Sequence, residues 1–144
     1  MLEEKKLMDN FKTVLRKEGL KITPQRISVL KEIIKNKGHR ESEEIYLAIK
    51  SSKTHVSRAT VYRTLDILVQ NNFVRKLNLG DGRARYESKI NSLHHDHLIC
   101  EICHDIIEFV NQDIEMLQEN IAIKHQFSLT RHVHQLFGIC KECR

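Results

Sequence analysis

The stretch Ser57–Glu87, SRATVYRTLDILVQNNFVRKLNLGDGRARYE, decides the fold of the first part of the chain. A serine of the N-cap type is followed by Val61, Leu65 and Leu68, which recur at the spacing of one helix face. Further along, apolar residues alternate with basic or polar ones on both sides of Gly80-Asp81-Gly82. That alternation is typical of a β-hairpin with a glycine-rich turn. The stretch therefore predicts a helix followed by a basic hairpin.

Three more helices are expected upstream of this stretch, over residues 2–17, over residues 24–38 and from residue 42 onward, because apolar residues recur there at helical spacing. Thr23-Pro24 is a helix start, in which a hydroxyl caps the helix and proline needs no N–H partner. Short helices followed by a basic hairpin describe a winged helix-turn-helix, whose fourth helix enters the major groove of DNA. The alternative interpretation is that the basic outer face of this helix is only a solvated surface.

The charge of the chain changes sign near residue 89. Residues 1–89 carry 20 Lys and Arg against 11 Asp and Glu, whereas residues 90–144 carry four against eight. The second segment also contains all four cysteines and seven of the nine histidines. The first composition suits a polyanion such as DNA, and the second suits a metal cation. We therefore predict two domains in an α+β protein.

Several classes of protein are excluded by composition. No apolar run approaches the roughly 18 residues that span a bilayer, and the first ten residues lack the apolar centre of a signal peptide. We therefore expect no membrane partner and a cytoplasmic location, where structural disulfides are rare.

Two CxxC pairs, Cys100-Glu-Ile-Cys103 and Cys140-Lys-Glu-Cys143, are separated by 36 residues. Each pair can hold one metal ion through a tight turn, and two pairs complete a tetrahedral sulfur site for Zn²⁺. Such a site leaves no position open for a substrate. The cysteines therefore predict a structural zinc ion.

The segment His94-His95-Asp96-His97 precedes an apolar strand that leads to Cys100. Because side chains alternate between the two faces of a strand, His95 and His97 are expected on one face and His94 and Asp96 on the other. Each pair is a plausible start of a separate nitrogen and oxygen metal site. His104 and His125 lack such neighbours, and we interpret them as ordinary surface residues. His134 shares its strand face with His132, and we interpret it as an ordinary residue as well.

The rest of the second segment predicts a small α/β domain. Residues 106–109 are expected to form a strand, and residues 111–124 a helix with Ile114, Leu117 and Ile121 facing inward. Residues 127–140 are mostly apolar and are expected to form a strand that leads to the last two cysteines. Because so little chain carries such apolar strands, we expect a second copy of the protein to complete the sheet.

The motifs HHDHLICEICHDIIEF (residues 94–109), ATVYRTL (59–65) and CKEC (140–143) together resemble the ferric uptake regulator family of bacterial metal-responsive repressors. The resemblance covers about residues 15–143. It implies a winged-helix DNA-binding domain over residues 1–85, a hinge over 86–92, and an α/β metal-binding and dimerisation domain over 93–144. It also implies a homodimer, or a tetramer of two dimers, that binds an AT-rich palindromic operator in double-stranded DNA and is no enzyme.

The resemblance further implies roles for individual residues, grouped by site. The structural Zn²⁺ ligands are Cys100, Cys103, Cys140 and Cys143; the regulatory ligands are His39, Glu87, His95, His97 and Glu108; an additional metal site comprises His94, Asp96, Glu115 and His132; and the DNA contacts are Lys21, Thr60, Tyr62 and Arg63. The regulatory ion is expected to be Fe²⁺, with Mn²⁺, Co²⁺ or Zn²⁺ as replacements.

Glu87 and Glu108 stand where peroxide-sensing members of the family typically have aspartate, so they favour iron sensing and the control of iron uptake genes. Peroxide-sensing, zinc-sensing and manganese-sensing regulators are the alternatives within the family. A small zinc hydrolase that uses His95 and His97 is the alternative from another class. It lacks an HExxH motif and an evident base, and it leaves the basic half unexplained.

Overall fold

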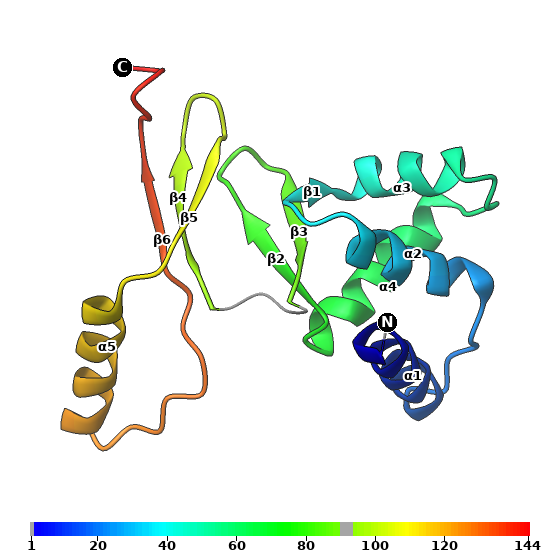
Figure 1. Ribbon diagram of the computed structural model, residues 1–144, viewed down its shortest axis with the longest axis horizontal. Helices are drawn as coiled ribbons and strands as arrows, with labels where there is room; N and C mark the ends of the chain where they lie inside the picture. Colours follow the sequence, from blue (N-terminus) through cyan, green and yellow to red (C-terminus); the bar gives the residue numbers. More distant parts are fainter. Residues whose placement is uncertain (1, 90–93) are drawn as a thin grey trace. The chain divides into compact units, whose positions relative to one another are not determined.

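The structure is a computed structural model that describes residues 2–89 and 94–144 (Figure 1). It divides into two compact units, Met1–Asn91 and Ser92–Arg144. Of the expected hinge, residues 90–92 lie outside the described residues, and residues 86–88 belong to the last strand of the first unit. Among the described residues, no helix combines the length and the apolar character needed to span a bilayer.

The first unit has the element order of a winged helix. Its elements are α1 (Leu2–Lys17), α2 (Pro24–Lys35), β1 (Arg40–Glu41), α3 (Ser42–Ser51), α4 (Arg58–Gln70), β2 (Val74–Asn78) and β3 (Ala84–Ser88). The predicted hairpin is the antiparallel pair β2 and β3, and β1 extends it to a sheet in the order β1-β3-β2. No pattern in the sequence predicts β1, because two residues are too few to produce a periodic pattern.

The expected helix caps are present. The hydroxyl of Thr23 accepts a hydrogen bond from the Arg26 N–H at 3.3 Å, and the hydroxyl of Ser57 accepts one from the Thr60 N–H at 3.1 Å. These caps confirm the predicted starts of α2 and α4. The prediction that α2 continues to residue 38 is wrong, because the helix ends at Lys35 and Asn36 turns the chain into an extended conformation.

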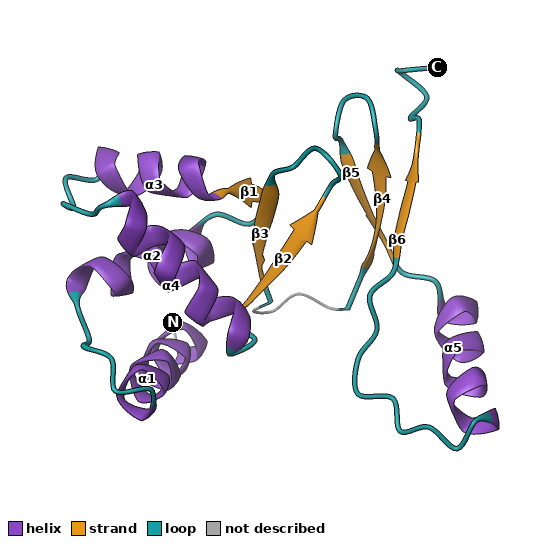
Figure 2. Cartoon of the chain, turned by 180° about the vertical axis from the view of Figure 1, so that it is seen from behind, coloured by secondary structure: helices purple, strands orange, loops and turns teal. Residues whose placement is uncertain are grey.

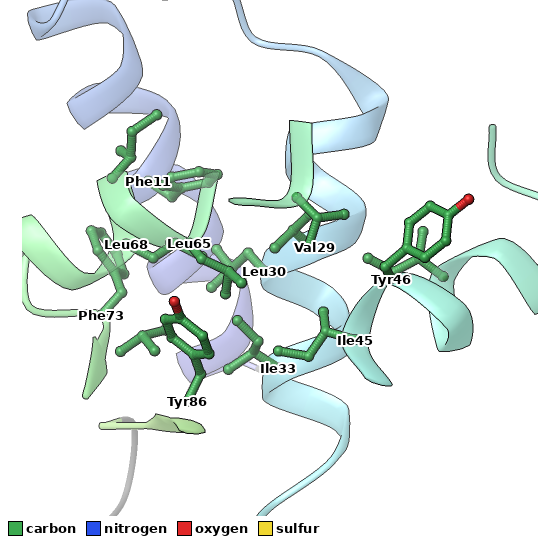
Figure 3. Close-up of a cluster of buried hydrophobic side chains, with 14 of the residues drawn as sticks. Phe11, Val29, Leu30, Ile33, Ile45, Tyr46, Leu65, Leu68, Phe73 and Tyr86 are labelled. Carbon is green, nitrogen blue, oxygen red and sulfur yellow. The ribbon is translucent and has the colours of Figure 1, made fainter. Parts of the chain in front are cut away.

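The core of the first unit is built from one face of each helix and from the sheet (Figure 3). Phe11 of α1 is fully buried and packs edge-to-face on Phe73 with ring centroids 5.7 Å apart. The predicted inner face of α4, which comprises Val61, Leu65 and Leu68, is fully buried. This packing fixes the rotation of α4 about its axis, so the opposite face of the helix is presented to solvent.

The second unit contains β4 (Asp96–Cys100), β5 (Ile106–Phe109), α5 (Gln112–Lys124) and β6 (Gln135–Gly138). The strands form a sheet in the order β5-β4-β6, with β5 antiparallel and β6 parallel to β4. Figure 2 shows α5 beyond one end of this sheet instead of across a face. Within the described residues of the second unit, no helix therefore packs on a face of this sheet.

Two predictions about the second unit are wrong. Leu117 and Ile121 are 61% and 60% exposed instead of facing inward, because nothing in this small unit covers that side of α5. The strand expected over residues 127–140 is limited to Gln135–Gly138, and the residues before it form an irregular connection. Large apolar side chains are consequently exposed on both the helix and the sheet, which is typical of a surface that binds another chain.

Replacement of Leu65 by alanine is expected to lower the free energy of unfolding by about 2–5 kcal/mol, because it opens a cavity in the fully buried core. Leu47→Ala is the matched control, since this leucine of α3 is 53% exposed and should change stability by less than about 0.5 kcal/mol. Urea unfolding followed by circular dichroism measures both variants. If both variants lose the same free energy of unfolding, the burial of the inner face of α4 is contradicted.

Candidate metal centres and nucleic-acid interface

The four cysteines come together at one end of the second sheet. Cys100 ends β4, Cys103 lies in the turn that follows it, and Cys140 and Cys143 follow β6, which runs parallel to β4. All four are free thiols whose sulfur atoms lie within 4.8 Å of one another. The Cys103 and Cys140 sulfurs are 3.7 Å apart. A tetrahedral zinc ion with Zn–S bonds of about 2.3 Å places its sulfur ligands about 3.8 Å apart, so the cluster fits zinc.

The electrostatics of this cluster favour a bound cation. Backbone N–H groups, first that of Cys103 and then that of Cys140, point at the Cys100 sulfur and lower the pKa of its thiol to about 6. The side-chain hydrogen bond to Cys140 raises the pKa of Cys143 to about 12. Without a cation, four crowded thiols cannot all ionise together. A divalent ion removes this conflict, because it binds all four as thiolates.

A second cluster lies wholly within the second unit and comprises His94, Asp96, Glu115 and His132. One ligand atom from each lies within 4.8 Å of the others. His94 Nε2 is 3.3 Å from both Asp96 Oδ1 and Glu115 Oε1. His132 Nε2 is 3.6 Å from Asp96 Oδ1 and 3.4 Å from Glu115 Oε1. Two imidazoles and two carboxylates therefore converge on one point.

Two atoms of this cluster are buried polar atoms that make no hydrogen bond, namely Glu115 Oε1 and His132 Nε2. Such orphaned atoms are rare and costly in proteins, so each calls for an explanation. A divalent cation would supply one, because both atoms are ligand atoms and two carboxylates would balance its charge. The donor set therefore fits a metal ion of the borderline class.

The predicted regulatory ligands are divided between the two units, and each part is compact. In the first unit, His39 Nε2 lies 2.6 Å from Glu87 Oε2, and the other oxygen of Glu87 accepts a hydrogen bond from Arg75 at 2.8 Å. Glu87 is only 5% exposed. Arg75 lies opposite Glu87 in the β2–β3 register, so a count outward from the hairpin turn could have identified this partner.

The part in the second unit comprises His95, His97 and Glu108. His95 Nε2 lies 3.5 Å from Glu108 Oε1, and the rings of His95 and His97 are 5.0 Å apart. His97 is opposite Glu108 in the register of β4 and β5. The expected separation of His95 and His97 from His94 and Asp96 agrees with this arrangement, since the two pairs belong to different clusters.

The predicted DNA contacts lie on the surface of the first unit. Tyr62 and Arg63 are exposed on the outer face of α4. Lys21 is exposed before α2, and it lines one surface depression together with Arg26 and Thr60. Cationic and hydroxyl groups are thus available beside α4, as phosphate contacts require.

Sequence reasoning missed one interaction of α4. Arg58 binds the Glu43 carboxylate of α3 with three contacts of 2.7–3.1 Å, and its guanidinium lies 4.4 Å from the ring centroid of Tyr46. The hydrogen bond from Arg58 lowers the pKa of Glu43. No short-range pattern signals a pair 15 residues apart.

A winged helix with exposed basic residues on its fourth helix, joined in one chain to a sulfur cluster and to nitrogen and oxygen clusters, defines the class of metal-responsive DNA-binding regulators. A profile described as the "Ferric uptake regulator family" matches residues 17–137. The chain therefore belongs to the ferric uptake regulator family, a family of transcription regulators, and the predicted α+β fold class with a winged-helix domain and a dimerisation domain is confirmed.

Individual relatives agree with this assignment. The ferric uptake regulation protein of Campylobacter upsaliensis is 44% identical over 144 residues, which cover 99% of this chain and 92% of the relative. The peroxide-responsive repressor PerR of Staphylococcus epidermidis is 32% identical over 130 residues, which cover 90% of this chain and 85% of the relative. A structure of the Helicobacter pylori ferric uptake regulator Fur, described as revealing three functional metal binding sites, is similar with a TM-score of 0.86, 34% identity, and coverage of 97% and 93%.

Replacement of Cys100 by serine is expected to remove one zinc ion per chain, because a hydroxyl does not replace the thiolate that ionises most readily. The second unit should lose several kcal/mol of stability, since structural zinc contributes about 10–16 kcal/mol in zinc-finger peptides. Elemental analysis of dialysed protein and thermal unfolding measure these losses. Glu101→Gln, an exposed neighbour without sulfur, is the control. Retention of one full equivalent of zinc in the serine variant would contradict the four-cysteine site.

Proposed function

We propose that this protein is an Fe²⁺-responsive repressor of iron uptake genes that acts as a homodimer in the bacterial cytoplasm. The observation that carries the proposal is the 2.6 Å contact between His39 Nε2 and Glu87 Oε2. These two metal-ligand residues belong to the winged-helix unit itself. A cation that binds them therefore acts directly on the part of the protein that reads DNA.

The exposed face of α4 enters the major groove in this proposal. Tyr62 contacts thymine methyl groups, and Arg63 reaches base edges or phosphates. Thr60 binds a phosphate, and Lys21 enters the adjacent minor groove, where an AT-rich sequence favours a cationic side chain. A two-fold symmetric dimer places two such helices on one operator, so the operator is palindromic.

Metal binding controls this geometry by joining the two units. His39 and Glu87 belong to the first unit, and His95, His97 and Glu108 belong to the second. One cation bound by all five ligands holds the units at a single relative orientation. In a dimer, that orientation sets the separation of the two α4 helices, so binding of the cation and binding of DNA stabilise each other.

The choice of iron is supported by ligand chemistry and by similarity. Three imidazoles and two carboxylates suit Fe²⁺, and Mn²⁺, Co²⁺ and Zn²⁺ can replace it. The identity to a ferric uptake regulation protein is 44%, against 32% to a peroxide-responsive repressor. Peroxide sensing is the second candidate, because three imidazoles and two carboxylates can hold iron in either role.

The second unit supplies the dimer contact. Its exposed apolar side chains on the sheet include Leu98, Ile107 and Phe137, and α5 exposes Leu117 and Ile121. A second copy of the chain would cover these surfaces, and two dimers paired as a tetramer are the alternative assembly. The zinc ion at the four cysteines is structural, since it ties the end of the chain to the turn after β4.

DNA binding to an AT-rich palindrome is expected to require Fe²⁺, Mn²⁺ or Co²⁺ under anaerobic conditions, as measured by fluorescence anisotropy. His97→Ala should bind DNA weakly even when metal is present, because the substitution removes a buried ligand of the regulatory site. The variant should still retain structural zinc and form the dimer. His125→Ala, an exposed histidine at the end of α5, is the control. If the unaltered protein binds DNA with equal affinity in the presence and absence of metal, the proposal is overturned.

The same assay separates iron sensing from peroxide sensing. Brief exposure of the Fe²⁺-loaded protein to peroxide should leave histidines intact by mass spectrometry, and DNA binding should return after Fe²⁺ is restored. Permanent loss of binding together with oxidised histidine would assign the protein to the peroxide sensors.

Lys21→Ala is expected to weaken DNA binding and to reduce the slope of log affinity against log salt concentration by about 1, because one cationic group that displaces counterions from the DNA is lost. Lys141→Ala removes an exposed charge from the second unit and should leave the slope unchanged. Identical slopes for the Lys21 variant and the unaltered protein would remove this residue from the interface.

A further inference from the structure

Asp96 is the most enclosed acidic group among the described residues, with 2% of its surface exposed. Its two carboxylate oxygens have different neighbours. Oδ1 lies 3.3 Å from His94 Nε2 and 3.6 Å from His132 Nε2, so it faces the additional metal site. Oδ2 lies 3.2 Å from Nδ1 of His134. The carboxylate therefore connects the additional site to a histidine outside its ligand set.

The direction of this hydrogen bond follows from its acceptor. A carboxylate oxygen accepts hydrogen bonds, so in the contact with Asp96 the donor is the Nδ1–H tautomer of His134 and the acceptor is Oδ2. A metal-binding carboxylate held in this way cannot rotate freely and presents one oxygen to the metal. Residues that hydrogen-bond to a metal ligand in this way orient the ligand and alter metal affinity substantially.

The main chain of His134 is held as well as its side chain. Its carbonyl oxygen accepts a hydrogen bond from the His97 N–H at 3.3 Å, next to the point where β6 begins to pair with β4. The ring of His134 also lies edge-on to Phe109, with centroids 5.8 Å apart. His134 is therefore fixed to β4 and β5 at three points, and the connection that carries His132 enters the site in a defined position.

We infer that His134 is a positioning residue of the additional metal site, where its Nδ1–H holds Asp96 with Oδ1 facing the cation. The prediction that His134 is an ordinary surface histidine is thereby replaced. This inference rests on the proposed additional site at His94, Asp96, Glu115 and His132. His134 does not itself bind the ion.

Two variants of similar size separate the hydrogen bond from simple packing. His134→Asn retains a nitrogen donor close to the position of Nδ1, whereas His134→Leu places a methyl group there. Both are made in a background with His39→Ala and Glu108→Ala, which disables the regulatory site without altering the ligands of the additional site. His125→Leu in the same background is the matched control, since this histidine is exposed at the end of α5.

The measurement is a titration of the zinc-containing protein with Co²⁺ alone, followed by its visible absorption, which reports the coordination geometry. His134→Leu is expected to raise the dissociation constant for Co²⁺ by about 10–100-fold and to change the shape of the spectrum. His134→Asn should stay within about threefold of the background protein, because the donor is retained. The control should match the background in both respects.

The outcomes that overturn the inference are distinct. Unchanged affinity and spectrum in His134→Leu, or equal losses in the Leu and Asn variants, would exclude the hydrogen bond as the cause. If the background protein and Asp96→Asn bind Co²⁺ alike, the additional site itself is absent and the inference fails with it. Metal-free thermal unfolding checks that each variant folds, and His134→Ala replaces the Leu variant if that variant does not.

Discussion

The two clusters of nitrogen and oxygen groups each depend on one buried carboxylate, Glu87 in the first and Asp96 in the second. A buried carboxylate is costly unless its charge is matched and its oxygens are hydrogen-bonded. In each case one oxygen is held by a residue of the fold, Arg75 or His134, and the other faces imidazoles. The protein thus holds both carboxylates in place, with one oxygen of each facing an imidazole nitrogen.

The small size of the second unit explains its other features. Four short elements cannot bury the apolar residues that they carry, so the sheet and α5 expose large side chains such as Leu98 and Leu117. Units of this size commonly gain stability from a metal ion or from another chain. A metal ion at the cysteine cluster and a second chain on the exposed apolar surface could therefore each add the stability that the small core does not supply.

Local signals in the sequence predicted much of the first unit because its elements are set by short-range rules. The N-caps Thr23 and Ser57, the buried face of α4 and the β2–β3 hairpin all follow from spacing and turn chemistry. The same rules failed for α5, where Leu117 and Ile121 are exposed. An apolar helix face indicates that the face is buried, but it does not indicate whether the same chain or another chain covers it. They also extended the strand before Cys140 too far, since apolar composition alone does not supply a pairing partner.

By itself, the sequence determined the class of ligand chemistry: paired CxxC motifs define a sulfur site, and the alternation of His94 to His97 divides the histidines between two clusters. The family resemblance also named the distant residues Glu115 and His132, and the structure brings both to His94 and Asp96. Only the tertiary structure showed that Arg58 binds Glu43 and that His134 contacts Asp96. These contacts depend on how separate elements pack, and packing is set by the whole chain, so no short stretch of sequence reveals it.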